Sequence, residues 1–141
     1  LSCLVGSEMC IRDSIYIAGA GNIGKSLAKK TNEDFNIKLI EKCEEQSELA
    51  NEALDNVLVL NADAADKDFL DSESIQDCDV FVAVTHDDES NVLCSLMAKK
   101  LGSKKTVTII NNEAYFDLVG KKSWTLSYLL FRSPFHISLN T

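Results

Sequence analysis

The stretch IYIAGAGNIG at residues 15–24 decides the fold of this chain. An apolar run typical of a buried strand comes first, and three glycines in GxGxxG spacing then open a helix-patterned stretch. In such a turn the glycines allow a tight bend, a close approach of the backbone to a pyrophosphate, and tight packing of helix on strand. Unpaired N–H groups at the helix start would face the phosphates. The motif predicts an adenine-nucleotide site formed by Gly19, Ala20, Gly21, Asn22, Ile23 and Gly24.

A second feature of nucleotide-binding strands is an acidic residue at the end of the next strand, and Glu41 meets it, 22 residues after Gly19. Its carboxylate can accept both hydroxyl protons of a ribose and would repel a 2′-phosphate. The sequence therefore favours NAD(H) over NADP(H), although neighbouring Lys42 can soften that choice. ATP and ADP carry the same free ribose, so Glu41 does not separate them from NAD(H). The alternative is a solvated surface glutamate.

Strand and helix patterns alternate along the rest of the chain. Apolar runs at 37–41, 57–60, 79–85 and 106–110 predict strands, and helical patterns are present at 22–32, 43–54, 67–70, 88–101 and 113–119. In 88–101 the apolar residues recur at helical spacing and indicate a core-facing side. The pattern predicts an α/β fold, a Rossmann-like doubly wound parallel sheet of order 3-2-1-4-5, with a ligand crevice at the carboxyl ends of the strands.

Composition narrows the classes of partner. The chain has 141 residues, which suits one domain or part of one, and a formal net charge of −8. Since its lysines are interleaved with acids, we expect no nucleic-acid partner. Its five cysteines form no CxxC pair or metal-ligand spacing with the two histidines, so we expect reduced thiols and no metal site. No apolar run is long enough to span a membrane, and we expect no direct membrane insertion.

The two ends do not fit the strand and helix plan. Residues 1–14 have no clear period and are expected to be a non-native or disordered leader, which leaves 15–120 as the nucleotide-binding domain. Residues 121–141 hold the one proline and no period that continues the sheet, so we expect a sixth strand to be lost or altered there. A frameshift near Lys122 is one explanation, and a genuine amphipathic end segment is the other.

Several segments together carry a family resemblance. They are IYIAGAGNIGKSLAKK, IKLIEK, NADAAD, DVFVAVTHDDESNVLCSLMAKKLG and AYFDLV, and the most specific part is the strand at 79–85 with the Thr-x-x-Asp-Glu-x-Asn that follows. Over about residues 15–120 the chain resembles the RCK N-terminal, or TrkA-N, domain of bacterial Trk potassium-uptake regulators, and more narrowly their second nucleotide-binding half. The resemblance implies a cytoplasmic, non-catalytic regulatory domain that is peripheral to the membrane and binds a potassium-transporter subunit, as part of a homo-oligomeric ring or a tandem RCK unit.

The resemblance adds residues at two more strand ends. Asp63 is placed to meet the adenine edge or to close the pocket, where Ala62 and Ala64 leave room for a flat ring, and Thr85 should point toward the distal part of the ligand. The alternative role of an aspartate here is helix capping, which is as good a reading for Asp66 but a weaker one for Asp63. Asn91 is a further family position.

Other readings of these strand ends stay open. The acids at 87–89 could form a metal cluster, but capping and the helix dipole also explain them. Many family members carry an arginine on the fifth strand that can reach a phosphate, whereas this chain has Ile109 there.

Two other classes of protein share the glycine motif. An NAD-dependent oxidoreductase fragment would explain Glu41 as well, and His86 is then a candidate acid at a strand end. No second group that could orient His86 is visible in the sequence, and no Tyr-x-x-x-Lys pair follows the strand at 79–85. A structural module that binds no ligand would make Gly21 and Glu41 accidental. We therefore expect a binding domain and not an enzyme.

Overall fold

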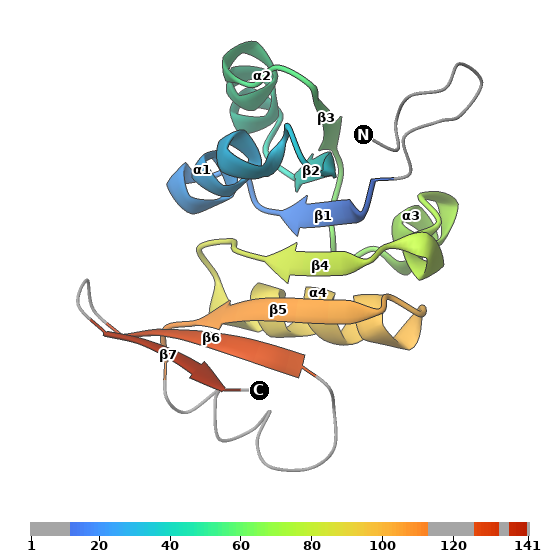
Figure 1. The fold of residues 1–141 in the computed structure, drawn as a ribbon. Coiled ribbons are helices and arrows are strands. Elements are labelled where there is room, and N and C mark those ends of the chain that lie inside the picture. Colours follow the sequence, from blue (N-terminus) through green and yellow to red (C-terminus); the bar gives the residue numbers. More distant parts are fainter. Residues whose placement is uncertain (1–11, 113–125, 133–135, 141) are drawn as a thin grey trace.

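The computed structural model describes residues 12–112, 126–132 and 136–140. The first five strands of the chain are parallel and adjacent in the sheet: β1 (Ser14–Ala18), β2 (Asn36–Glu41), β3 (Val57–Asn61), β4 (Val80–Ala83) and β5 (Lys105–Ile110). Their order is β3-β2-β1-β4-β5, so the predicted order is confirmed (Figure 1). The order reverses between β1 and β4, where doubly wound sheets bind their ligands.

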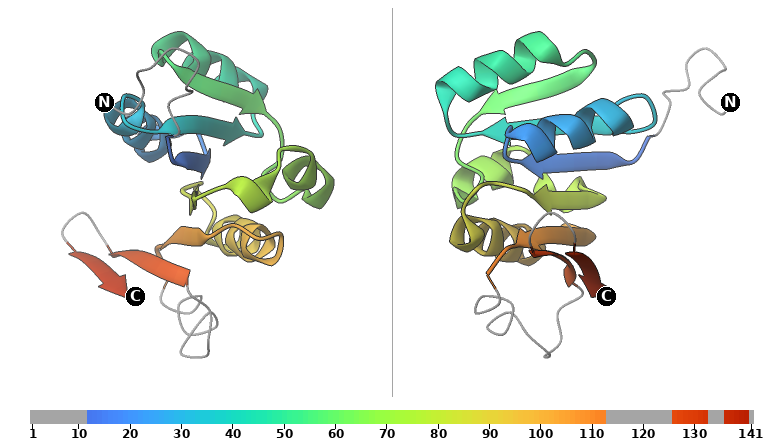
Figure 2. Two further views of the ribbon diagram at one scale, coloured as in Figure 1. Left: turned by 45° about the vertical axis from the view of Figure 1, so that its right-hand side comes forward. Right: turned by 90° about the vertical axis from the view of Figure 1, so that its left-hand side faces the viewer.

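Helices cover both faces of this sheet. They are α1 (Asn22–Thr31), α2 (Glu44–Ala53), α3 (Lys67–Ser72) and α4 (Asp88–Lys100), with a short 3-10 helix, η1 (Ile75–Asp77), before β4. In the left view of Figure 2, α1 lies on one side of the strands, and α3 and α4 lie on the other. The helices that the sequence predicts at 22–32, 43–54, 67–70 and 88–101 are therefore present, whereas the one at 113–119 lies outside the described residues.

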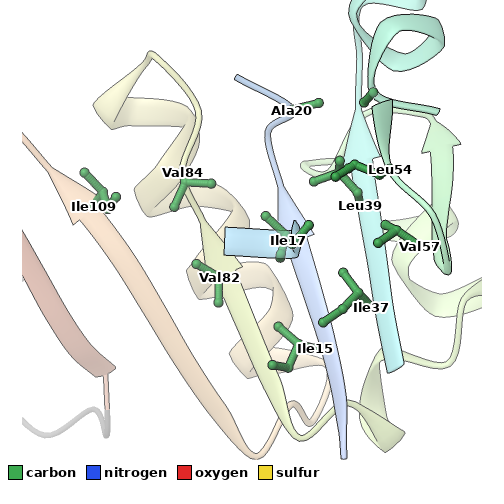
Figure 3. Packing of buried hydrophobic residues seen from close by; sticks show 12 residues of the cluster. Ile15, Ile17, Ala20, Ile37, Leu39, Leu54, Val57, Val82, Val84 and Ile109 are labelled. Carbon is green, nitrogen blue, oxygen red and sulfur yellow. The ribbon is translucent and has the colours of Figure 1, made fainter. Parts of the chain in front are cut away.

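Alternate side chains of the central strands build two apolar cores. Toward α1 and α2, the strands contribute Ile15, Ile17 and Leu39 to one cluster (Figure 3). Ala28 and Ala50 of the helices belong to the same cluster. Burial on both faces explains why these strands are continuous apolar runs rather than alternating ones. On the opposite face, a second cluster joins the strands to α3, η1 and α4, and its members include Tyr16, Ala18, Ile40, Leu70, Phe81 and Ala98.

Helix α4 differs from the sequence prediction in the side that it buries. Its buried residues are Asn91, Cys94, Ser95 and Ala98, whereas Leu93 and Leu96 are 51% and 40% exposed. The helical spacing predicts a core face that includes both leucines, and that prediction is wrong for these two. The reason lies on β5, where the buried Thr108 hydroxyl hydrogen-bonds the Ser95 hydroxyl. The polar side chains on this face of β5 thus pack against the small and polar residues of α4.

The sheet continues beyond β5, in a region where no apolar periodicity predicts a strand. Strand β6 (Leu126–Arg132) pairs in parallel with β5, with Thr106 opposite Leu126, and β7 (His136–Asn140) pairs antiparallel to β6. Both strands lie at the β5 edge of the sheet (Figure 1). Residues 126–132 therefore occupy the place of a sixth strand, so of the two expectations, lost or altered, a lost strand does not apply, and an altered strand sequence stays a prediction. The frameshift near Lys122 concerns the encoding DNA and stays a prediction.

Helix α1 can start where it does only because residue 24 is a glycine. A Cβ on Gly24 would lie 1.8 Å from the Gly19 carbonyl oxygen, far inside contact distance. Gly24→Ala must push α1 away from β1, and we expect it to lower the free energy of unfolding by about 2–4 kcal/mol in chemical denaturation. Gly21→Ala is the matched control, because its Cβ would make an ordinary 3.4 Å contact and should cost less than about 1 kcal/mol. Equal losses in the two variants would contradict this account.

Candidate functional site

A cleft of about 390 Å³ opens at the carboxyl ends of β1 to β4. The loops that leave these four strands form its walls, together with the start of α4. Among the predicted site residues the cleft brings together Gly19, Gly21, Glu41, Asp63, Ala64 and Thr85. Ala20, Asn22, Ile23 and Gly24 do not line it with side chains: Ala20 and Gly24 are buried, and Asn22 and Ile23 are exposed in the first turn of α1.

The three glycines of the motif are required for different reasons. Gly19 has φ +113°, and a Cβ there would lie 3.0 Å from the backbone of Val84 and Thr85. Gly24 makes the close contact with Gly19 described above. Gly21 has φ −74°, an ordinary backbone conformation, and a Cβ there would lie 3.4 Å from the His86 imidazole, an ordinary contact. The packing of this chain therefore explains Gly19 and Gly24 but not Gly21, which faces the cleft.

Helix α1 begins at this glycine without a side-chain cap. Its N-cap residue is Gly21, no acidic residue lies in the first turn, and Lys25 N–H donates the first helical bond to the Gly21 carbonyl at 2.9 Å. The N–H groups of residues 22 to 24 precede that bond. A helix start of this kind carries partial positive charge and amide donors, which are what a phosphate group requires.

Glu41 is bound to the glycine loop. One carboxylate oxygen accepts from Ala20 N–H at 2.7 Å, and the other accepts from Cys43 N–H at 2.9 Å. The carboxylate therefore fixes the loop between β1 and α1 relative to the end of β2. Each oxygen has a second lone pair, so the same carboxylate can also accept a ribose hydroxyl. The ribose contact stays a prediction, whereas the loop contact is a role that sequence reasoning missed.

The two aspartates after β3 have separate roles. Asp63 accepts from Ala65 N–H at 2.8 Å and lies 3.5 Å from the Lys42 ammonium, with both side chains well exposed. Asp66 caps α3 by accepting from Asp68 and Phe69 N–H. The structure thus gives helix capping to Asp66 and places Asp63 in the cleft wall, next to Ala64.

Thr85 and Asn91 join the end of β4 to β5. The Asn91 oxygen accepts from Thr85 N–H at 2.8 Å and from the Thr85 hydroxyl at 2.6 Å. The Asn91 amide donates to the carbonyls of Thr85 at 3.1 Å and Ile109 at 3.0 Å. Asn91 is fully buried, so its four bonds replace water completely. Thr85 lines the cleft as predicted, but its hydroxyl is already held by Asn91.

The acids at 87–89 serve local structure. Asp87 caps α4, and hydrogen bonds from the Ser90 hydroxyl and the Ser90 N–H hold the pKa of its carboxyl below the ordinary value. Asp88 accepts from Asn111 and Asn112 N–H, at 2.8–3.1 Å, where the chain leaves β5. Capping is therefore confirmed for Asp87. Within the described part of the chain, no three His, Cys, Asp or Glu residues gather in a way that could hold a metal ion.

Comparison with known proteins places the chain in a family. The model of the TrkA-N domain matches residues 15–125. The chain belongs to the TrkA-N domain family. It is 44% identical over 105 residues to the Trk system potassium uptake protein TrkA of Vibrio alginolyticus, a match that covers 74% of this chain and 23% of that protein. The chain thus spans about a quarter of the length of this relative.

Solved structures support the fold. The TrkA-N domain of the Escherichia coli inner membrane protein ybaL superimposes with a TM-score of 0.69 at 13% identity, over 87% of this chain and 89% of that one. The GsuK channel bound to NAD gives a TM-score of 0.66 at 16% identity, over 82% of this chain and 20% of that one. At these identities the likeness concerns the fold alone.

This TrkA-N domain lacks a strand-five cation at its cleft. Ile109 is 5% exposed and packs in the core toward α1 and α2, while its carbonyl accepts from Asn91. Among the described residues that line the cleft, Lys42 and His86 are the basic ones. The three described cysteines, Cys43, Cys78 and Cys94, are free thiols. No helix among the described ranges is long and apolar enough to cross a membrane.

Asn91 offers a direct test of the β4 to β5 connection. Asn91→Leu keeps the volume but leaves the Thr85 N–H and the carbonyl of Ile109 without their partner. We expect a loss of about 2–4 kcal/mol in the free energy of unfolding, measured in urea. Asn51→Leu, at an exposed position of α2, is the matched control and should change stability by less than about 0.5 kcal/mol. If both variants were equally stable, the buried amide would not be a structural bridge.

Proposed function

We propose that this chain is a nucleotide-sensing regulatory domain of a Trk-type potassium uptake system, and that NAD(H) is its ligand. The observation that carries the proposal is Gly21: the packing of the chain does not require it, yet it faces the cleft beside the uncapped start of α1. Because Gly21 has no side chain, the cleft has space beside the amide donors at the start of α1, and such a place suits a diphosphate. The name of the Vibrio alginolyticus relative supports the potassium uptake role.

The residues present fit a dinucleotide. The start of α1 would receive the diphosphate over Gly21, and Glu41 would accept the ribose hydroxyls of the adenosine half. Asp63 and Ala64 would border the adenine, and Thr85 would border the distal half of the ligand. The GsuK channel, which shares the fold, was solved with NAD. ATP or ADP can make the same contacts through their phosphates and ribose, so they are the alternative ligands.

The proposed role is regulation without catalysis. The rival is the NAD-binding part of an oxidoreductase, which shares the glycine loop and Glu41, so the fold does not separate the two. An oxidoreductase needs an oriented acid or base, and His86 is the imidazole in the cleft wall. No hydrogen bond joins that imidazole to another residue of the described ranges, which favours a binding role. Family membership favours the regulatory role over the oxidoreductase.

The partner we propose is a membrane potassium-transporter subunit, contacted from the cytoplasmic side by a homo-oligomeric ring or tandem RCK assembly. A ligand can bias such a transporter only by binding one arrangement of the assembly more tightly than another. The hydrogen bonds of Asn91 and Asp88 offer a route, because they connect the cleft at Thr85 to the end of β5. The exposed Leu93 and Leu96 of α4 lie on the same helix.

Calorimetry with NADH, NAD, ATP and ADP tests the ligand. We expect binding of NADH by the whole chain and a loss of at least about tenfold in Gly21→Val, whose side chain would enter the cleft. Glu41→Ala should weaken NADH by about tenfold and narrow its advantage over NADPH, since a charged acceptor is lost. Glu52→Ala, on the exposed side of α2, is the matched control and should bind normally.

Two results would count against this proposal. Equal binding by Gly21→Val and the wild type would place the ligand elsewhere. Oxidation of NADH by added keto substrates would assign the chain to the oxidoreductases.

A binding assay tests the transporter partnership. Immobilised chain should retain a detergent-solubilised Trk-type membrane subunit to a different extent with and without NADH, and Gly21→Val should lose that difference. If neither the wild type nor Gly21→Val retained the membrane subunit, with or without NADH, the proposed partner would be contradicted.

A further inference from the structure

His86 lies over the glycine loop at the start of α1. A Cβ built on Gly21 would come within 3.4 Å of the His86 Cε1 and 3.5 Å of its Nε2. The imidazole therefore stands across the cleft surface of Gly21, where α1 begins with its uncapped amide groups. His86 is exposed, and no hydrogen bond joins its imidazole to the described parts of the chain. A group placed on the Gly21 backbone from the cleft would meet the imidazole.

The other ionisable groups of the cleft are held by partners. Glu41 accepts from two backbone amides, and Asp63 accepts from Ala65 N–H and pairs with Lys42. Asp87, beside His86, accepts from Ser90. Of these carboxylates, Asp87 has a pKa that the hydrogen bonds from Ser90 hold below its ordinary value.

One thiol also faces the cleft from α4. Burial is the largest of the effects that raise the pKa of the Cys94 thiol to about 12, so this group is uncharged near neutral pH. Imidazole is the side chain whose ordinary titration falls near neutral pH. His86 is the imidazole among the described residues of this cleft wall.

We propose that His86 contacts the diphosphate of the bound nucleotide and that protonation of its imidazole tightens binding. The inference rests on the proposed function and adds a residue and a pH response to it. A diphosphate over Gly21 would receive amide N–H groups from α1 on one side and an imidazolium N–H on the other. A hydrogen bond between a cation and a phosphate oxygen is shorter and stronger than a neutral one.

The direction of the pH response follows from the charge. Below its titration midpoint the imidazole is a cation and attracts the phosphates; above it the imidazole is neutral and contributes only a neutral hydrogen bond. Affinity should therefore fall as pH rises through neutrality. By linkage, NADH must move the midpoint of the His86 NMR titration to higher pH by the same free energy. A histidine that only packed against the loop would show no such shift.

The test is calorimetry with NADH on the whole chain at about pH 6 and about pH 8. NADH is the probe because each of its two phosphates has one ionisable group, which is strongly acidic. The charge of the diphosphate is therefore constant over this pH range. We expect the wild type to bind roughly two- to fivefold more tightly at the lower pH, the size of a solvent-exposed charge contact. His86→Gln should bind equally at both values, at the weaker level. His86→Lys should bind equally at both, at the tighter level. His136→Gln, which changes the other histidine, should keep the response of the wild type.

Each outcome decides the inference. A wild type that binds NADH equally at both values, or His86→Gln with the full pH response, overturns the role of His86 and leaves the proposed function intact. His86→Lys that binds no better than His86→Gln overturns the phosphate contact. No NADH binding by the wild type at either pH overturns NADH as the ligand and the inference with it.

Discussion

The contact between Gly24 and the Gly19 carbonyl is the constraint on which the cleft depends. Because residue 24 has no side chain, α1 starts directly against the turn that leaves β1. The same turn requires the positive φ of Gly19. A side chain on Gly19 would have no room, because the backbone of Val84 and Thr85 lies against it. Two glycines thus bring the end of β4 and the start of α1 together. The third glycine, Gly21, then presents bare backbone to the space between them.

The other half of the cleft depends on buried polar groups. Asn91 fixes the end of β4 through Thr85 and reaches the β5 backbone at Ile109, while Asp88 holds the residues that follow β5. A fully buried amide is stable only when all of its bonds are formed, so this arrangement resists small changes. It also explains the surface of α4, because the buried side is occupied by small and polar residues and leaves Leu93 and Leu96 in solvent.

The sequence predicted those parts of the fold that depend on local patterns. The order of β1 to β5, the helix starts and the glycine turn all follow from apolar runs, turn residues and one motif. The buried side of α4 was misjudged, because apolar spacing alone cannot show that the strand opposite presents Thr106 and Thr108. Strand β6 was missed because residues 126–132 carry no alternation typical of a half-buried strand. Long-range pairing places it beside β5.

The sequence predicts which residues come together at the cleft, but it does not predict the hydrogen bonds that they make. Six of the ten predicted ligand positions line the cleft, because strand ends in a parallel sheet meet at one edge. Their hydrogen bonds depend on side chains that approach from distant parts of the chain. Glu41 reaches back to Ala20, and Asp88 reaches forward to Asn111. The pair Asn111-Asn112 after the last apolar run was the available signal for the second contact, since a strand exit needs acceptors for its amides.

The last question is how a domain with a net charge of −8 can accept an anionic nucleotide. The acids at this cleft bind the protein's own amides: Glu41 holds the loop, Asp63 its own turn, and Asp87 the start of α4. The start of α1, by contrast, has no acid in its first turn and no side-chain cap, and its N-cap residue, Gly21, lines the cleft. The start of α1 is therefore locally positive, in contrast to the negative net charge of the whole chain. The same arrangement explains why the proposal above depends on one imidazole: the carboxylates and Lys42 already have partners, so a proton on His86 would add a positive charge beside Gly21.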